Sequence, residues 1–197
     1  MSFSRDAARQ FHAPAASDRQ QFERFRAGDA TAFELLFRAY AARLCAFAAG
    51  YVHSSAIAEE LVQDLFCWLW DHRAETPAPA SVRAYLFASL RNRAINHLRR
   101  ERLSLDFRSS VARASAGASP LGGADADLLA ADLSSALAAA VRRMPTRCRE
   151  VFTLIRDDHL SYAETAEVLG ISPKTVEIHM SRALSLLRGH LAPWLSQ

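Results

Sequence analysis

Amide, aromatic and guanidinium side chains recur with helical spacing between residues 82 and 102, and together they could hold an unpaired nucleic acid strand. Amides can hydrogen-bond exposed base edges, aromatic rings can stack on bases, and arginines can hold the phosphate backbone. At about 100° per residue these side chains share one face of a helix: Tyr85, Ser89, Asn92, Asn96, Arg99 and Arg100. The opposite face carries the predicted core residues Leu86, Phe87, Leu90, Ala94 and Leu98. A solvated helix face can contain the same polar residues, so this pattern alone leaves both interpretations open.

Residues 161–183 have the pattern of a helix-turn-helix, which can place its second helix in the major groove of DNA. Ser161 and Glu164 form a capping box, Ala166 suits the close crossing of two helices, and Gly170 suits the turn. Val176 supplies a core contact from the second helix. Ser172 caps that helix, and Lys174, Thr175, Glu177 and His179 are predicted to point into the groove, with Arg182 toward a phosphate. The alternative is a helix-turn-helix with a purely structural role.

An acidic helix precedes the arginine-rich one. Residues 58–75 contain five acidic residues and one arginine, a local charge of −4, whereas residues 82–102 contain six arginines and one glutamate, a local charge of +5. This change of sign predicts two surfaces for two different partners. The polar residues of the acidic helix are Glu59, Glu60, Gln63 and Asp64, which predict a contact with a basic partner or simple solvation. We do not expect a metal site, because no histidine or second carboxylate helix has matching spacing.

The composition is that of an all-α protein. Half of the 197 residues are hydrophobic, and only 7 are glycine and 7 proline. The net charge of +3 indicates a mild preference for polyanions. The longest apolar stretch, residues 44–52, is too short to span a bilayer, and the N-terminus lacks the pattern of a secretion signal, so we expect a cytoplasmic protein. The three cysteines are expected to be small buried residues.

The chain is predicted to contain two helical domains. A segment rich in serine, glycine and alanine, residues 103–127, is expected to be a flexible linker, because it is too long for an ordinary loop. It separates an N-terminal domain, residues 18–102, from a C-terminal domain, residues 128–191, and residues 1–17 are expected to form a loose arm. The predicted helices are 19–27, 29–49, 54–70, 81–100, 128–142, 146–157, 161–169 and 173–189.

Together these segments resemble the sigma-70-type RNA polymerase sigma factors of the small extracytoplasmic-function (ECF) group. Residues 58–66 are similar to region 2.2, which in this family docks on the clamp helices of the polymerase β′ subunit. Residues 84–100 resemble the helix that melts and reads the −10 promoter element, and the preceding loop, about residues 71–81, captures a flipped base in the family. Residues 160–184 resemble region 4.2, which reads the −35 element.

The resemblance implies a non-enzymatic sigma factor without a cofactor or metal. Its expected partners are core RNA polymerase, through the β′ clamp helices and the β flap, promoter DNA, and an anti-sigma factor that can be membrane-bound. Tyr85 stands where the family often has tryptophan, and Glu177 and His179 replace residues that are more often basic. Residues 174–179 resemble the branch that signals iron-siderophore uptake. The alternatives are a self-sufficient helix-turn-helix activator and an interaction adaptor that does not contact DNA.

Overall fold

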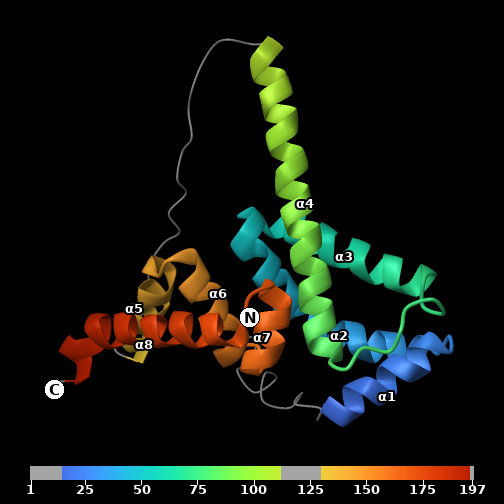
Figure 1. The fold of residues 1–197 in the computed structure, drawn as a ribbon, viewed down its shortest axis with the longest axis horizontal. Helices are drawn as coiled ribbons and strands as arrows, with labels where there is room; N and C mark the ends of the chain where they lie inside the picture. The colour runs from blue at the N-terminus through green and yellow to red at the C-terminus, as the bar shows by residue number, and fades with distance from the viewer. Residues whose placement is uncertain (1–14, 112–129, 196–197) are drawn as a thin grey trace. The chain divides into compact units, whose positions relative to one another are not determined.

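The computed structural model describes residues 15–111 and 130–195, and within them the side chains of residues 18–103 and 136–192. The chain divides into two compact units, Met1–Leu105 and Asp106–Gln197, which we call unit 1 and unit 2. The described residues form eight α-helices and no strand (Figure 1). This confirms the predicted all-α fold of two small helical domains.

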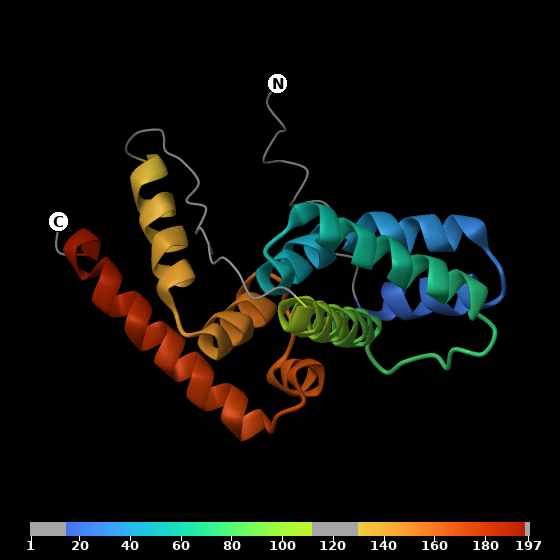
Figure 2. The same cartoon turned by 90° about the horizontal axis from the view of Figure 1, so that it is seen from above.

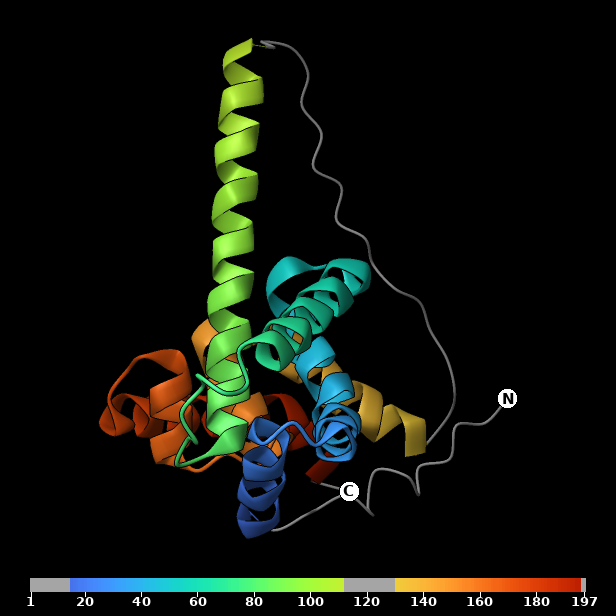
Figure 3. The same ribbon diagram turned by 90° about the vertical axis from the view of Figure 1, so that its right-hand side faces the viewer.

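Unit 1 is built from α1 (Ala15–Arg26), α2 (Ala30–Val52), α3 (Ser55–Asp71) and α4 (Val82–Val111), whose last six residues lie beyond the boundary at Leu105. Figure 2 shows α2 and α3 side by side, and α4 crosses them and projects beyond them in Figures 1 and 3. Apolar residues at helical spacing on all four helices meet in one core, which excludes water from these faces. Its largest fully buried side chains are Phe22, Phe25, Leu44, Val62, Leu65, Leu86, Phe87 and Leu90.

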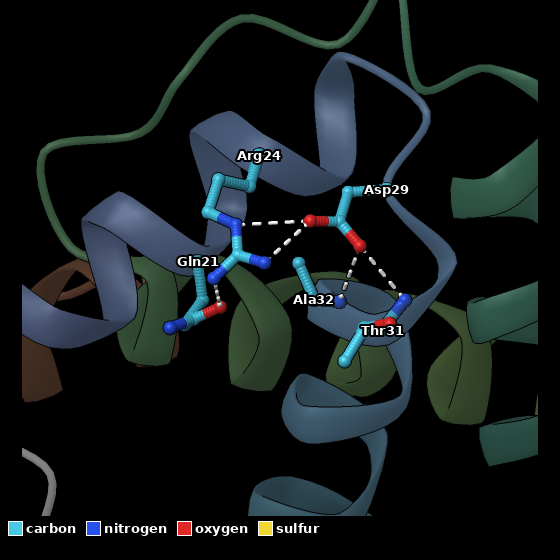
Figure 4. A network of polar contacts seen from close by, with 5 residues as sticks. All are labelled: Gln21, Arg24, Asp29, Thr31 and Ala32. Carbon is cyan, nitrogen blue, oxygen red and sulfur yellow. Dashed lines mark hydrogen bonds and ion pairs between the residues drawn. The ribbon is translucent and has the colours of Figure 1, made fainter.

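A polar network joins the end of α1 to the start of α2 (Figure 4). Asp29 is the N-cap of α2, and its Oδ1 accepts hydrogen bonds from the backbone N–H groups of Thr31 (2.9 Å) and Ala32 (3.2 Å). Its Oδ2 accepts two hydrogen bonds from the Arg24 guanidinium, at 2.6 and 2.9 Å, and Arg24 also donates to Gln21. The bond from Ala32, followed by that from Arg24, holds the pKa of the Asp29 carboxyl below its usual 3.8.

A buried hydrogen bond connects α1 to the middle of α2. The Tyr40 hydroxyl donates to Asp18 Oδ2 over 2.5 Å, and both residues are buried. Burial, and then the neighbouring Asp18 carboxylate, raise the pKa of Tyr40 well above its usual 10. The hydroxyl therefore stays protonated and gives the buried Asp18 side chain a hydrogen-bond partner.

α2 is long and apolar enough, by length and composition alone, to cross a bilayer. The same apolar residues form part of the core of unit 1, including Leu36, Tyr40 and Leu44.

The last helix of unit 1 is longer than predicted. α4 runs to Val111, whereas the prediction ended it near Arg100 and began the linker at Leu103. The prediction was wrong here because no glycine or proline interrupts the chain between Ser81 and Gly117, so nothing local stops helix propagation. The remainder of the predicted linker, residues 112–127, and most of the predicted arm, residues 1–14, lie outside the described residues.

Unit 2 contains α5 (Ala130–Arg143), α6 (Thr146–Arg156), α7 (Tyr162–Leu169) and α8 (Pro173–Leu195). The last helix continues past Gly189, where we predicted its end, because one glycine within a helix costs only about 1 kcal/mol. The buried residues include Val151, Phe152 and Leu154 on α6 and Ala166, Val168 and Leu169 on α7. From α8 they include Val176, Met180, Ala183 and Leu187.

The predicted helix-turn-helix is confirmed as α7 and α8. Ser161 Oγ accepts from the Glu164 N–H, and the Glu164 carboxylate accepts from the Ser161 N–H, which completes the capping box. Gly170 adopts a left-handed conformation with φ of +64°, which lets its N–H reach the last carbonyls of α7. Ser172 Oγ then accepts from the Thr175 N–H at 3.1 Å and caps α8.

Candidate functional site

A groove of about 470 Å³ lies between α3 and α4 in unit 1. The α3 wall presents carboxylates and an aromatic ring, from Glu60, Asp64 and Trp68. The α4 wall presents amides, hydroxyls and cationic groups: Tyr85, Ser89, Asn92, Arg93, Asn96, His97 and Arg100. Residues predicted to contact two different partners therefore line one groove.

The pattern of buried residues on α3 explains why its polar side chains face the groove. Leu61, Leu65 and Leu69 are buried, and Glu60, Asp64 and Trp68 follow each other at four-residue intervals on an exposed side. Glu59 and Gln63 are also exposed on α3 but do not line the groove. All four predicted polymerase-contacting residues are therefore accessible, and the structure separates them into two strips.

Among the predicted core residues of α4, Leu86, Phe87, Leu90 and Ala94 are buried, as expected. The prediction for Leu98 was wrong, since its side chain is only half-buried. The reason is that this side of α4 faces a shallow surface hollow, where Leu98 lies with the exposed side chains of Ile95 and Leu103.

The predicted strand-contacting residues fall mostly into the groove. Asn92, Asn96 and Arg100 are exposed there, and Ser89 and Tyr85 are partly covered. Arg99 is exposed but lies outside the groove, in a surface hollow lined by Ile95, Leu98, Arg102 and Leu103. The structure therefore brings together five of the six predicted residues and sets Arg99 apart.

Three polar or aromatic residues of the groove were not predicted from the sequence: Trp68, Arg93 and His97. Trp68 is 40% exposed, stacks on His72 with ring centroids 4.5 Å apart, and has the Arg93 guanidinium 5.6 Å from its ring centre. The sequence did contain a signal for Trp68. This residue follows Glu60 and Asp64 at four-residue intervals and therefore shares their side of the helix. Arg93 and His97 carried no such signal, because only the position of α3 decides which side of α4 forms a wall.

The segment between α3 and α4 begins with an ordered turn. Thr76 is buried, and its Oγ1 donates to the His72 carbonyl at 2.9 Å. Arg73 donates to the Trp70 carbonyl at 2.7 Å and lies 4.8 Å from the Trp70 ring centre. These contacts anchor the start of the loop that the family resemblance associates with base capture.

Within the described part of the chain, no group of three or more histidine, cysteine or acidic side chains could hold a metal ion. The three cysteines are free: Cys148 is buried, Cys45 is half-buried and Cys67 is exposed. The prediction that all three are buried is confirmed for Cys148 and was wrong for the half-buried Cys45 and the exposed Cys67. Cys67 is exposed because it follows Gln63 and Asp64 on the exposed side of α3.

In unit 2 the start of α8 presents a polar surface. Ser172, Lys174, Glu177 and Arg182 are exposed, and Thr175 is half-buried with its hydroxyl 2.9 Å from that of Ser172. Lys174 Nζ donates to the Glu177 carboxylate at 2.7 Å, and this hydrogen bond raises the pKa of Lys174. A negative ligand must therefore compete with Glu177 for this lysine.

His179 does not point outward as predicted. Its side chain is half-buried, and Nδ1 lies 3.8 Å from the Cys148 sulfur on α6. The reason is its position on the helix: it follows Val176 by three residues and precedes Met180, and both of these are buried. The exposed neighbour is Ile178, which is 59% exposed and was not among the predicted site residues.

Two family models match the chain. The model described as Sigma-70 region 2 matches residues 36–103, and the model described as Sigma-70, region 4 matches residues 134–187. Together they cover more than half of the chain. The RNA polymerase sigma factor FliA of Pseudomonas aeruginosa is 39% identical over 69 residues, which are 35% of this chain and 28% of FliA. The chain therefore matches less than a third of the length of this relative.

Two solved structures share the fold. CnrH, in complex with the cytosolic domain of CnrY, has 24% identity and a TM-score of 0.61, covering 90% of this chain and 98% of that chain. The sigma factor RpoE of Bartonella quintana, in complex with the anti-sigma factor NepR, has 24% identity and a TM-score of 0.59, covering 81% and 96%. At this level of identity the two structures establish similarity of fold.

Proposed function

Because the chain belongs to the sigma-70 family of RNA polymerase sigma factors, we propose that it binds core RNA polymerase, recognises −35 and −10 promoter elements and assists promoter melting. Unit 1 would bind the polymerase and the −10 element, and unit 2 the −35 element. Two binding modules on one chain raise each other's effective concentration at a promoter. The chain would act without intrinsic catalysis, in the cytoplasm, where the polymerase is.

We further propose membership of the ECF group. Only residues 104–133 separate the two family matches, a segment shorter than a typical domain. No additional sigma region of domain size fits between them, which is a feature of this group. The similarity of residues 174–179 to the iron-siderophore branch stays a prediction.

The observation that carries the proposal is the α3–α4 groove within the region 2 match. Exposed amides of Asn92 and Asn96 stand beside the Tyr85 ring and the Arg100 guanidinium, a combination suited to bases and backbone of an unpaired strand. In a duplex the Watson–Crick edges of the bases are occupied by pairing, whereas an unpaired strand exposes them. A groove that binds these edges would therefore stabilise the melted state of the promoter.

The −35 contact is proposed for the exposed start of α8. Lys174 and Arg182 would hold phosphates, and Ser172, Thr175 and Glu177 would face the bases. His179 is withdrawn from this set, because it packs toward Cys148. Ile178 replaces it, since an exposed aliphatic side chain can contact a thymine methyl group.

Polymerase docking is proposed for the exposed polar face of α3, residues Glu59, Glu60, Gln63 and Asp64, on the β′ clamp helices, with unit 2 on the β flap. An anti-sigma factor is a further proposed partner. It is supported by the two relatives of the same fold, which were solved with the cytosolic domain of CnrY and with NepR.

Run-off transcription with core polymerase on genomic fragments tests this function. We expect discrete start sites that depend on the added protein, and binding to core polymerase in the absence of DNA. A helix-turn-helix activator would instead bind DNA alone and would not bind core polymerase by itself. That second pattern would contradict the proposal.

A further inference from the structure

The two walls of the α3–α4 groove carry opposite charge. Glu60 and Asp64 are exposed on the α3 wall, and Arg93 and Arg100 lie on the α4 wall. No hydrogen bond or ion pair of either carboxylate is recorded for the part of the chain that the structure describes. The negative wall is therefore not neutralised by the positive wall.

A nucleic acid strand in this groove carries its phosphates past both walls. The arginines attract these phosphates and the carboxylates repel them, so the two walls act in opposite directions on the same ligand. The repulsion is present as long as Glu60 and Asp64 face solvent. A basic protein surface placed against α3 would cancel this repulsion.

We propose that Glu60 and Asp64 form an electrostatic barrier that lowers the affinity of the free protein for single-stranded DNA, and that a basic docking surface removes the barrier. This inference rests on the proposed function for the identity of the two ligands. It adds a mechanism by which polymerase docking would permit strand binding. By linkage, a bound strand would tighten the docking of the basic partner by the same factor.

The test measures binding of a fluorescein-labelled single-stranded DNA oligonucleotide to the full-length free protein by fluorescence anisotropy at low salt. The Glu60→Gln/Asp64→Asn variant removes both charges and keeps similar side-chain shapes. Exposed charge interactions change equilibria by roughly 1.5- to fivefold each, so removal of both charges should tighten binding by about two- to 25-fold. The gain should shrink at high salt, because salt screens exposed charges.

The matched control is Glu23→Gln/Glu34→Gln, which changes the net charge by the same amount within unit 1. Both glutamates are exposed, pair with arginines of their own helices and lie outside the groove. We expect little change in strand binding from this control. An equal gain in both double variants would mean that only the net charge matters and would contradict the proposed barrier. The absence of any gain in the Glu60→Gln/Asp64→Asn variant would also contradict it.

A further variant separates this inference from the proposed function. Asn92→Ala/Asn96→Ala should weaken binding of the same oligonucleotide. If it does not, the groove is not the strand site and the proposed role of unit 1 fails. If it does, and removal of the carboxylates has no effect, only the barrier fails. Circular dichroism melts of each variant confirm that the helices are retained.

Discussion

Replacing Asn92 and Asn96 together with alanine should disable promoter opening while sparing the fold. Both side chains are exposed in the α3–α4 groove, and no hydrogen bond of either amide is recorded among the described residues. The buried face of α4, with Leu86 and Leu90, is untouched. Alanine is also the better helix former, so unit 1 should be at least as stable.

The expected loss of promoter opening can be estimated from the hydrogen bonds of the two amides. A hydrogen bond contributes about 0.5–1.5 kcal/mol net, so losing one base contact at each position costs about 1–3 kcal/mol. Since about 1.4 kcal/mol is a factor of ten, the open fraction should fall by roughly five- to 150-fold. The cost of unstacking the bases is unchanged, because the variant removes only what offsets it.

Permanganate reactivity of thymines near −10 measures the opening directly. The variant holoenzyme should still form and should still protect the −35 region, and a premelted bubble template should partly restore its activity. Gln20→Ala, which removes an exposed amide on α1 outside the groove, is the control and should open normally. Normal thymine reactivity of the Asn92→Ala/Asn96→Ala holoenzyme on a duplex promoter would show that this face is merely solvated.

Three further predictions concern single features of the structure. Gly170→Ala should destabilise unit 2 by about 1–2 kcal/mol in urea unfolding, because φ of +64° disfavours a Cβ, and Gly170→Asn should cost less; equal stability of both variants would contradict this. The lowered pKa of Asp29 means that its stabilising effect is fully present above the unfolded value of 3.8 and is lost as the pH falls through the lower folded value. Acid titration of Asp29→Asn, followed by circular dichroism, should therefore lack part of the wild-type loss of stability at low pH. Reversing the charge with Glu60→Lys/Asp64→Lys should weaken binding to core polymerase, most at low salt, and unchanged affinity in a pull-down would remove these residues from the docking surface.

Much of the helical framework could be predicted from the sequence because its signals are local. The caps at Asp29, Ser54 and Ser161, and the turn at Gly170, use hydrogen bonds between groups only a few residues apart. The periodicity of apolar residues also identified most of the buried faces. These features depend on residues that are close together along the chain, and the sequence alone shows which residues those are.

The site depended on neighbours that are distant along the chain. Sequence periodicity placed Glu60 and Asn92 on exposed helix faces but could not show that the two faces form opposite walls of one groove. It likewise pointed His179 toward solvent, whereas packing of α8 against α6 turns it toward Cys148. A helical pattern determines which residues share a side of one helix. The packing of helices against each other decides what that side faces, because ridges and grooves of both partners set their crossing.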